Sequence, residues 1–281
     1  MAFPYKIRNS RYCFNPKAKE RFRVSRSKID LFLECPRCFF LDQRHGLARV
    51  KYPPFTLNNA VDELLKKEFD KHRAQGTWHP VLKENDLRLK PFKHEKMDEW
   101  RDAMRCGVQY DLPDTLLTIR GGVDDIWVDG EGVLYVADYK ATSKEAGEEV
   151  NLDSDWQIMY KRQAEVYQWL LRKNGFTVAN TAYFYYVNGQ RDVDGFNGQL
   201  KFNVKVIPYV GNDEWIEKTV YELNECLKKD VIPESGFDCE YCGYVDAVSH
   251  MLHSNNGEGS TKQPAEENAK KTANSDVEAL F

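Results

Sequence analysis

The stretch from Gly121 to Thr142 constrains the fold of this chain more than any other part of its sequence. Two runs rich in β-branched and aromatic residues, TLLTIRGGVDDIWVD and GVLYVADYKAT, flank the turn sequence Asp-Gly-Glu-Gly. Such runs around a glycine-rich turn predict a β-hairpin. Because side chains alternate along a strand, Asp138 and Lys140 emerge on one face and Tyr139 on the other. Charged side chains therefore stand where a sheet normally carries apolar ones.

The carboxylates of this hairpin have the pattern of a divalent-cation site. Asp124 follows the Gly121-Gly122 pair on the first strand, and cross-strand neighbours approach closely enough for Asp124 and Asp138 to share one cation. Oxygen ligands suit Mg²⁺ or Mn²⁺, which hold a phosphate and lower the pKa of a bound water. Lys140 is then placed to position that water or to stabilise charge in the transition state. The alternative is an exposed hairpin with a cross-strand salt bridge.

The rest of the sequence predicts a mixed α/β sheet flanked by helices, behind an N-terminal helical region. Serines precede an apolar pattern from Ile29 to Leu41, which predicts a capped helix that Pro36 bends or restarts. The unpatterned stretch 77–111 is expected to hold loops and a short helix near 95–106. A helix is expected over 57–72, with a buried stripe of Leu57, Val61, Leu64, Leu65 and Phe69. Further elements are expected as helices over 155–173 and 212–230 and as strands over 180–189 and 199–209.

The helix expected over 155–173 adds two polar residues to the hairpin region. Gln163 and Tyr167 are four residues apart, so they share one helical face beside an otherwise apolar surface. Polar groups in such a position usually have a binding partner, which strengthens the interpretation of the hairpin as an active site.

With these motifs in order, the chain resembles the PD-(D/E)XK nucleases. The motifs are Gly-x-x-Asp at 121–124, Asp-Tyr-Lys at 138–140 and Gln-x-x-x-Tyr at 163–167. The resemblance runs from about Ser25 to Tyr244 and is to the RecB-like branch, which includes AddB-type repair nucleases and CRISPR-associated adaptation exonucleases. It implies a restriction-endonuclease-like core and a Mg²⁺- or Mn²⁺-dependent deoxyribonuclease, expected to act as an exonuclease on single strands or ends.

The resemblance also implies roles for individual residues. Asp124 and Asp138 bind the metal, with Tyr139 in the same metal site, and Lys140 assists the attacking water. Gln163 and Tyr167 shape the substrate side and complete the catalytic set.

One position departs from the family pattern. Members often carry a metal-binding histidine in a Gly-x-x-hydrophobic-His sequence, whereas this chain reads Asn-Asn-Ala-Val-Asp over 58–62. Asp62 stands in the place of the histidine, and a carboxylate is itself a good Mg²⁺ ligand. We therefore expect Asp62 in the metal site; the alternative is a solvated helix residue.

Four of the seven cysteines form two Cys-x-x-Cys pairs, Cys35 with Cys38 and Cys239 with Cys242. Such pairing predicts a four-thiolate site, which Zn²⁺ and a [4Fe-4S] cluster both accept and which spacing does not assign. RecB-like relatives place a cluster here, with one cysteine before the core and three after it, whereas this chain divides its ligands two and two. The [4Fe-4S] cluster is favoured over Zn²⁺, and either would join the N-terminal helical region to the C-terminal segment.

Charge is distributed unevenly along the chain, although the formal net charge is only −4. Residues 1–28 contain several lysines and arginines but a single acid, Glu20. This excess of positive charge indicates either a basic arm that binds DNA or RNA or a solvated, disordered leader. We expect this arm over 1–24, the helical region over 25–110, the nuclease core with the second cysteine pair over 111–253, and a disordered tail over 254–281. The terminal SDVEALF is a candidate docking motif for a protein partner.

The sequence holds no apolar run of membrane-spanning length, and its first residues carry charges where a signal peptide needs an apolar segment. A cytoplasmic protein without membrane association is therefore expected, and seven cysteines in a reducing compartment favour metal or cluster binding over disulfides. The leading interpretation is a metal-dependent DNA nuclease in repair, recombination or CRISPR adaptation. The competing one is a non-catalytic nucleic-acid-binding subunit that retains the nuclease fold, and RNA as the substrate stays open.

Overall fold

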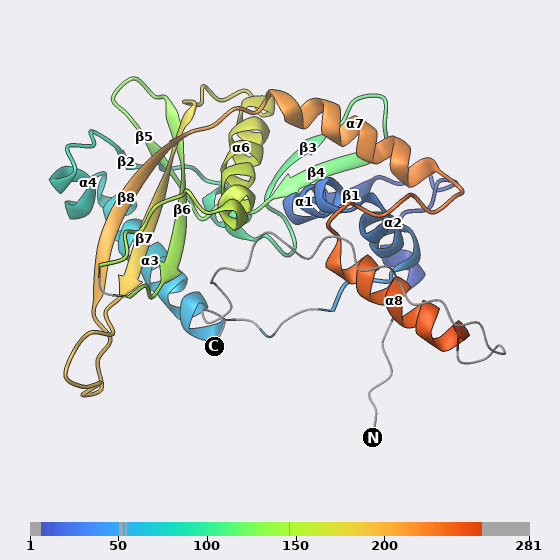
Figure 1. The fold of residues 1–281 in the computed structure, drawn as a ribbon. Coiled ribbons are helices and arrows are strands. Elements are labelled where there is room, and N and C mark those ends of the chain that lie inside the picture. Colours follow the sequence, from blue (N-terminus) through green and yellow to red (C-terminus); the bar gives the residue numbers. More distant parts are fainter. Residues whose placement is uncertain (1–6, 51–52, 54, 146, 255–281) are drawn as a thin grey trace. The chain divides into compact units, whose positions relative to one another are not determined.

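The computed structural model describes residues 7–50, 53, 55–145 and 147–254 (Figure 1). The chain forms two compact units, residues 1–239 and 240–281. In the second unit the described residues form one helix, α8 (Glu240–Ser254), which sequence reasoning did not predict. The tail expected from 254 and the SDVEALF motif lie, apart from Ser254, outside the described residues. The domain boundaries expected at 24, 110 and 253 stay predictions.

A five-stranded sheet carries the hairpin, in the order β2-β5-β6-β7-β8. β5 and β6 pair antiparallel as predicted, with Asp125 opposite Ala137, whereas β6 and β7 run parallel. The parallel pair is possible because a helix connects the two strands. The strands are β2 (Lys90–Pro91), β5 (Asp125–Val128), β6 (Leu134–Thr142), β7 (Thr181–Gly189) and β8 (Phe202–Val210).

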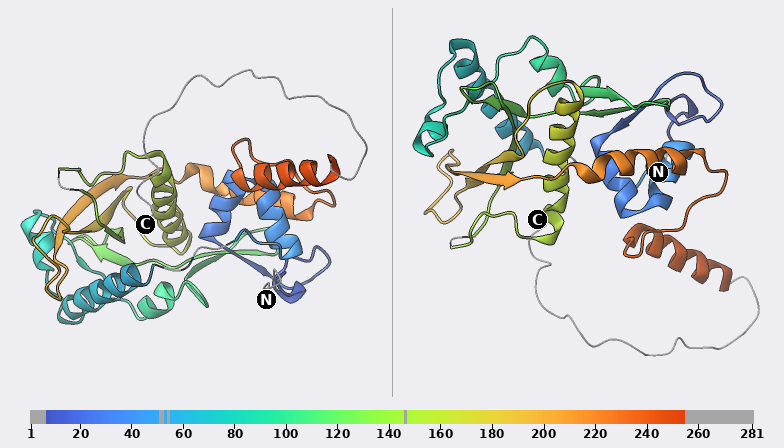
Figure 2. Two further views of the ribbon diagram at one scale, coloured as in Figure 1. Left: turned by 60° about the horizontal axis from the view of Figure 1, so that its bottom comes forward. Right: turned by 90° about the horizontal axis from the view of Figure 1, so that it is seen from above.

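Two helices cover the two faces of this sheet (Figures 1 and 2). Because side chains alternate along a strand, Trp127 and Tyr139 point toward Phe69 of α3 (Thr56–Gln75) and form one apolar core with it. Ile126 and Val136 point to the opposite face, where they form a second apolar core with residues of α6 (Ile158–Lys173). The buried stripe predicted for α3 is wrong at Leu57 and Leu64, which are 61% and 63% exposed. Only the part of α3 that lies over the sheet buries its side chains.

The first predicted strand of the hairpin region is in fact two strands in two sheets. β4 (Leu117–Gly121) belongs to a three-stranded sheet with β1 (Phe22–Ser25) and β3 (Val108–Asp111), in the order β1-β4-β3. The chain leaves β4 through Gly122, where an added Cβ would lie 2.5 Å from Cβ of Ala103. The missing side chain permits this close approach, and Asp124 follows directly, just before β5. Figure 2 shows α6 between the two sheets.

The N-terminal helices and α7 form the remaining layer of the first unit. α1 (Arg26–Glu34) and α2 (Pro36–His45) are separated at Cys35, so Pro36 restarts the helix as predicted, and α7 (Glu214–Lys228) packs against both. Ser25 stands at the N-cap of α1 but makes no side-chain capping bond. The short elements are η1 (Ser10–Tyr12), α4 (Pro80–Glu84), α5 (Met97–Arg101) and η2 (Asp155–Gln157).

The part of the basic arm that the structure describes is packed against the protein. β1 pairs in parallel with β4, Arg8 and Lys28 form ion pairs with the buried Asp42, and Arg21 pairs with Asp111. The expectation of a disordered leader is therefore wrong for residues 7–24, because β1 joins a sheet and Arg8 and Arg21 pair with acids of the fold. Among the described residues, no helix is both long and apolar enough to cross a membrane.

Candidate active site

Antiparallel register brings Asp124 opposite Asp138. β5 pairs Asp125 with Ala137, and one further step along each strand leads to Asp124 and Asp138. Asp138 is 1% exposed, and Asp124 accepts a hydrogen bond from the backbone N–H of Tyr139 at 3.1 Å. Burial raises the pKa of Asp138 to about 7; Lys140 opposes this shift and the charge of Asp124 adds to it.

Two lysines lie against these acids. The ammonium of Lys140 forms an ion pair with Asp138, and Lys66 Nζ of α3 lies 2.7 Å from Asp62 Oδ2 and 3.3 Å from Asp124 Oδ1. Burial disfavours the charge of both lysines, but the neighbouring acids outweigh it and raise the pKa of each. Burial, with the charge of Asp124, raises the pKa of Asp62 against the opposing effect of Lys66. Asp62 is therefore brought to the same place as the hairpin acids.

The N-terminal half of α6 supplies the other wall of this region. Lys140 Nζ lies 3.5 Å from Gln163 Oε1, and Gln163 Nε2 donates a hydrogen bond to the hydroxyl of Tyr167 at 3.1 Å. The same ammonium lies 4.4 Å from the ring centre of Tyr160, a cation–π contact. Tyr167 reaches this position because Gly121 has no side chain; an added Cβ there would lie 2.5 Å from its ring atom Cε1.

Comparison with known proteins agrees with this geometry. A family model for the PD-(D/E)XK nuclease superfamily matches residues 54–247, more than half of the chain. The chain belongs to the PD-(D/E)XK nuclease superfamily. A solved structure titled "Crystal structure of SSO0001" is among the matches, with 15% identity, a TM-score of 0.37 and coverage of 82% of this chain and 86% of that chain. No curated protein matches.

The acids of this superfamily member fit a divalent cation. The buried carboxylate of Asp138 forms an ion pair with the Lys140 ammonium and also faces the carboxylate of Asp124. Two facing carboxylates in a largely buried site repel each other, and a divalent cation between them would remove that cost. Asp124 and Asp138 provide hard oxygen ligands of the kind that Mg²⁺ and Mn²⁺ prefer. Lys66 provides one positive charge between Asp62 and Asp124, and a cation bound there would compete with it.

Tyr139, which the resemblance counts in the metal site, turns its side chain away from it. Its hydroxyl donates a hydrogen bond to Asp125 Oδ2 at 2.6 Å, on the α3 face of the sheet. Asp125 is fully buried and forms ion pairs with Arg73 and Arg101. Only the backbone of Tyr139 faces the acids. Of the two adjacent acids, Asp124 therefore belongs to the site, and Asp125 belongs to a structural cluster of ion pairs.

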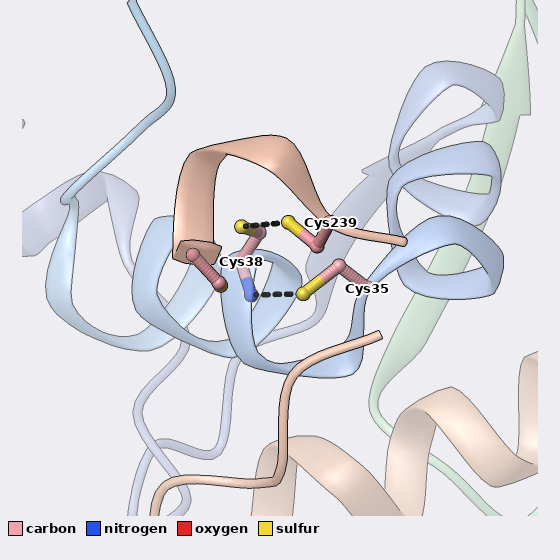
Figure 3. A group of neighbouring side chains, drawn as sticks. Cys35, Cys38 and Cys239 are labelled. Atoms are coloured by element: carbon pink, nitrogen blue, oxygen red, sulfur yellow. Dashed lines mark hydrogen bonds between the residues drawn. The ribbon is translucent and has the colours of Figure 1, made fainter. Parts of the chain in front are cut away.

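The predicted thiolate site begins with three cysteines of the first unit. The Sγ atoms of Cys35, Cys38 and Cys239 all lie within 4.8 Å of one another, and Figure 3 shows Cys38 Sγ facing Cys239 Sγ at 3.5 Å. Residues about two hundred positions apart in the sequence are therefore side by side. Cys242 belongs to the second unit, three residues beyond Cys239 and in the first turn of α8.

Backbone and side-chain donors point at these sulfurs. Cys35 Sγ accepts hydrogen bonds from the N–H groups of Cys38 at 3.4 Å and Gly236 at 3.2 Å. Burial disfavours the Cys35 thiolate, but these donors outweigh it and lower its pKa to about 7. The guanidinium of Arg49 lies 3.3 Å from Cys239 Sγ. The lowered pKa favours the Cys35 thiolate, the form that coordinates a metal, at neutral pH.

Sequence reasoning missed four residues of the active-site region. Lys66 follows Asp62 by one helical turn, and Tyr160 precedes Gln163 on the same helical face, so the spacing held a signal for both. Trp156 lies on η2, directly before α6, and its ring contacts that of Tyr160. Arg26 was counted in the basic stretch, yet its guanidinium is close enough to Tyr167 and Asp138 for their charges to raise its pKa, in spite of burial.

Proposed function

We propose that this protein is a RecB-like, Mg²⁺- or Mn²⁺-dependent deoxyribonuclease that hydrolyses phosphodiester bonds as an exonuclease. The observation that carries the proposal is the buried carboxylate of Asp138, which faces Asp124 and pairs with Lys140. A sheet that only had to be stable would gain nothing from burying Asp138 opposite a second, partly buried acid, because desolvating a charge costs several kcal/mol. This cost is offset when a cation and a phosphate are bound.

In this proposal Asp124, Asp138 and Asp62 would hold the metal, and the backbone N–H of Tyr139 orients Asp124. The metal supplies a polarised phosphoryl oxygen and a water of lowered pKa. Lys140 orients the attacking water and stabilises the charge that grows on the phosphate. Gln163 holds the Lys140 ammonium at its Oε1, and Tyr167 in turn holds Gln163.

The thiolate site has a structural role in the proposal, with Cys35, Cys38, Cys239 and Cys242 as ligands of a [4Fe-4S] cluster. Zn²⁺ is the alternative, and iron and zinc analysis of anaerobically purified protein separates the two. A thiolate-bound metal needs a reducing compartment, so the nuclease is placed in the cytoplasm. DNA repair or CRISPR adaptation, within a complex that contains a protein partner, is the proposed context.

The test uses end-labelled linear DNA and a closed circular single strand, each with Mn²⁺ or Mg²⁺. The wild-type protein is expected to degrade linear strands and to leave the circle intact, since an exonuclease needs an end. Lys140→Met, which keeps the side-chain volume, is expected to lower the rate about 10²- to 10³-fold, the usual effect of removing one group that stabilises charge in the transition state. The matched control is Lys205→Met, because Lys205 pairs with Glu149 on an exposed part of β8.

Equal rates for both variants would refute the assigned site. Tight DNA binding without cleavage by the wild-type protein, with either metal, would refute the enzyme and favour the competing function of a non-catalytic nucleic-acid-binding subunit. Cleavage of RNA but not DNA would refute the proposed substrate.

A further inference from the structure

Three residues on one face of α6, and a fourth just before this helix, lead from the catalytic lysine to the surface. The three helical residues, Tyr160, Gln163 and Tyr167, are spaced by three and four positions, so each lies about one turn from the next. Tyr167, Gln163 and Tyr160 are linked to one another or to Lys140 by the contacts described above. The fourth, Trp156, lies on η2 directly before α6, and its ring meets that of Tyr160 edge to face with centroids 5.3 Å apart.

Trp156 is 57% exposed, although it stands at the end of a series of polar and half-buried groups. The edge-to-face contact supports the indole on one side, because the edge of one aromatic ring is attracted to the face of another. Exposed apolar surface continues over Ile158 and Met159 in the first turn of α6. A large aromatic side chain that is held in place yet open to solvent is typical of a binding surface.

We propose that Trp156 is a stacking platform for an unpaired nucleobase of the substrate strand, close to the phosphate that is cleaved. This inference rests on the proposed function and deepens it, since it assigns one residue to the binding of an unpaired base. Every base has a π-face, so stacking on an aromatic side chain holds a strand whatever its sequence. A base within a duplex has both faces covered by its neighbours and has none to offer to the indole.

The position of Trp156 relative to Lys140 fits this role. Two contacts, of 5.3 Å and 4.4 Å, separate the indole from the Lys140 ammonium. This short series of contacts means that a base on Trp156 would belong to a nucleotide close to the cleaved phosphate. The ammonium of Lys140, which contacts both Tyr160 and Asp138, supplies a positive charge where the strand's phosphates would pass.

The test is a double-mutant cycle between Trp156 and individual bases. Binding of dye-labelled oligothymidylate is measured by fluorescence anisotropy in Ca²⁺ at one fixed salt concentration, with an abasic nucleotide placed at each position in turn. Trp156→Ala is expected to weaken binding of the intact single strand about 5- to 150-fold, and Trp156→Phe to retain most of it. An abasic nucleotide at one position should weaken binding to the wild-type protein by a similar factor. The same abasic strand should bind Trp156→Ala almost as well as the intact strand does.

The matched control is Trp78→Ala, which removes a similarly exposed tryptophan that lies against Lys90. It is expected to change binding less than twofold, as is Trp156→Ala with a blunt duplex. Unchanged thermal unfolding of each variant shows that the fold is intact.

Three results of the binding experiment would overturn the inference. The first is that Trp156→Ala binds single strands as tightly as the wild-type protein does, and the second is that it loses equal affinity for single strand and duplex. The third is that the effect of the substitution and the effect of every abasic position are additive. Loss of binding to a protein partner with unchanged DNA binding would identify the surface as a protein contact and would also overturn it.

The cycle separates this inference from the proposed function. Coupling between Trp156 and one base in a protein that does not cleave would leave the stacking site standing and refute the enzyme. Cleavage by the wild-type protein without such coupling would refute only the stacking site.

Discussion

Replacement of Asp125 by Asn is expected to destabilise the protein strongly, although Asp125 takes no part in the proposed chemistry. Asp125 is fully buried, and its carboxylate meets Arg73, Arg101 and the hydroxyl of Tyr139. An amide of the same shape can keep its oxygen toward the two guanidinium groups and turn its N–H₂ group toward the Tyr139 hydroxyl, but it removes the negative charge that compensates both arginines.

The size of the loss in unfolding free energy depends on the partners that Arg73 and Arg101 retain in the variant. Loss of one partner from a buried ion pair costs about 3 to 5 kcal/mol, because a charge is left without compensation. Both arginines retain Asp70, and each donates to a backbone carbonyl, Arg73 to Phe92 and Arg101 to Asp124. These contacts place the expected cost at the lower end, about 3 kcal/mol.

Asp70→Asn is the matched control, since Asp70 pairs with the same two arginines but its side chain is 44% exposed. Water compensates an exposed group, so its loss is expected to cost about 1 kcal/mol or less. Urea unfolding of both variants, followed by tryptophan fluorescence, measures the difference.

A cost for Asp125→Asn below about 1 kcal/mol, or no larger than that of Asp70→Asn, would refute this reasoning about burial. Asp125→Asn is also expected to lower nuclease activity, because Asp125 holds Arg101 and Tyr139 in place. Arg101 donates a hydrogen bond to the carbonyl oxygen of Asp124, and Tyr139 lies between Asp138 and Lys140 on β6.

Two further predictions concern packing and pH. Gly121→Ala is expected to destabilise the protein by about 1 to 3 kcal/mol, because its Cβ would lie 2.5 Å from Tyr167 Cε1, and to lower nuclease activity; unchanged activity and urea midpoint would contradict it. Burial lowers the pKa of His79 from its usual value near 6.5, against the opposing effect of Glu68, so the unfolded chain binds the proton more readily and stability is lost as the pH falls below about 6.5. The neutral ring accepts a hydrogen bond from the N–H of Val81 at Nδ1; urea midpoints between pH 5 and 7.5 should therefore vary less in His79→Asn, and an equal pH dependence would count against the assignment.

Local sequence signals were sufficient for most of the elements. Strand alternation and the Asp-Gly-Glu-Gly turn predicted the β5–β6 hairpin and the common face of Asp138 and Lys140, since both depend only on neighbouring residues. Helical spacing likewise predicted the shared face of Gln163 and Tyr167. The break between β4 and β5 was not predictable, because it depends on Ala103, a distant residue that occupies the place of a side chain at Gly122.

The burial of α3 shows the same limit. Leu57 and Leu64 follow a helical apolar pattern, but which part of the helix lies over the sheet is decided by the sheet and not by the helix. The arm was read from its charges alone, and the sequence could not show that Asp42 and Asp111 neutralise Arg8 and Arg21.

The sequence by itself determined the chemistry that this protein has available: two acids and a lysine on a hairpin, a polar pair on a helix, and cysteines in pairs. Each of these rests on spacing within one element, which the geometry of a strand or a helix converts directly into position. Only the tertiary structure decided which charges meet. It divided Asp124 from Asp125, brought Lys66 and Asp62 of α3 to the hairpin, and set Trp156 two contacts from Lys140. Electrostatic and stacking interactions depend on separation in space, and elements far apart in the chain acquire that separation only when they pack.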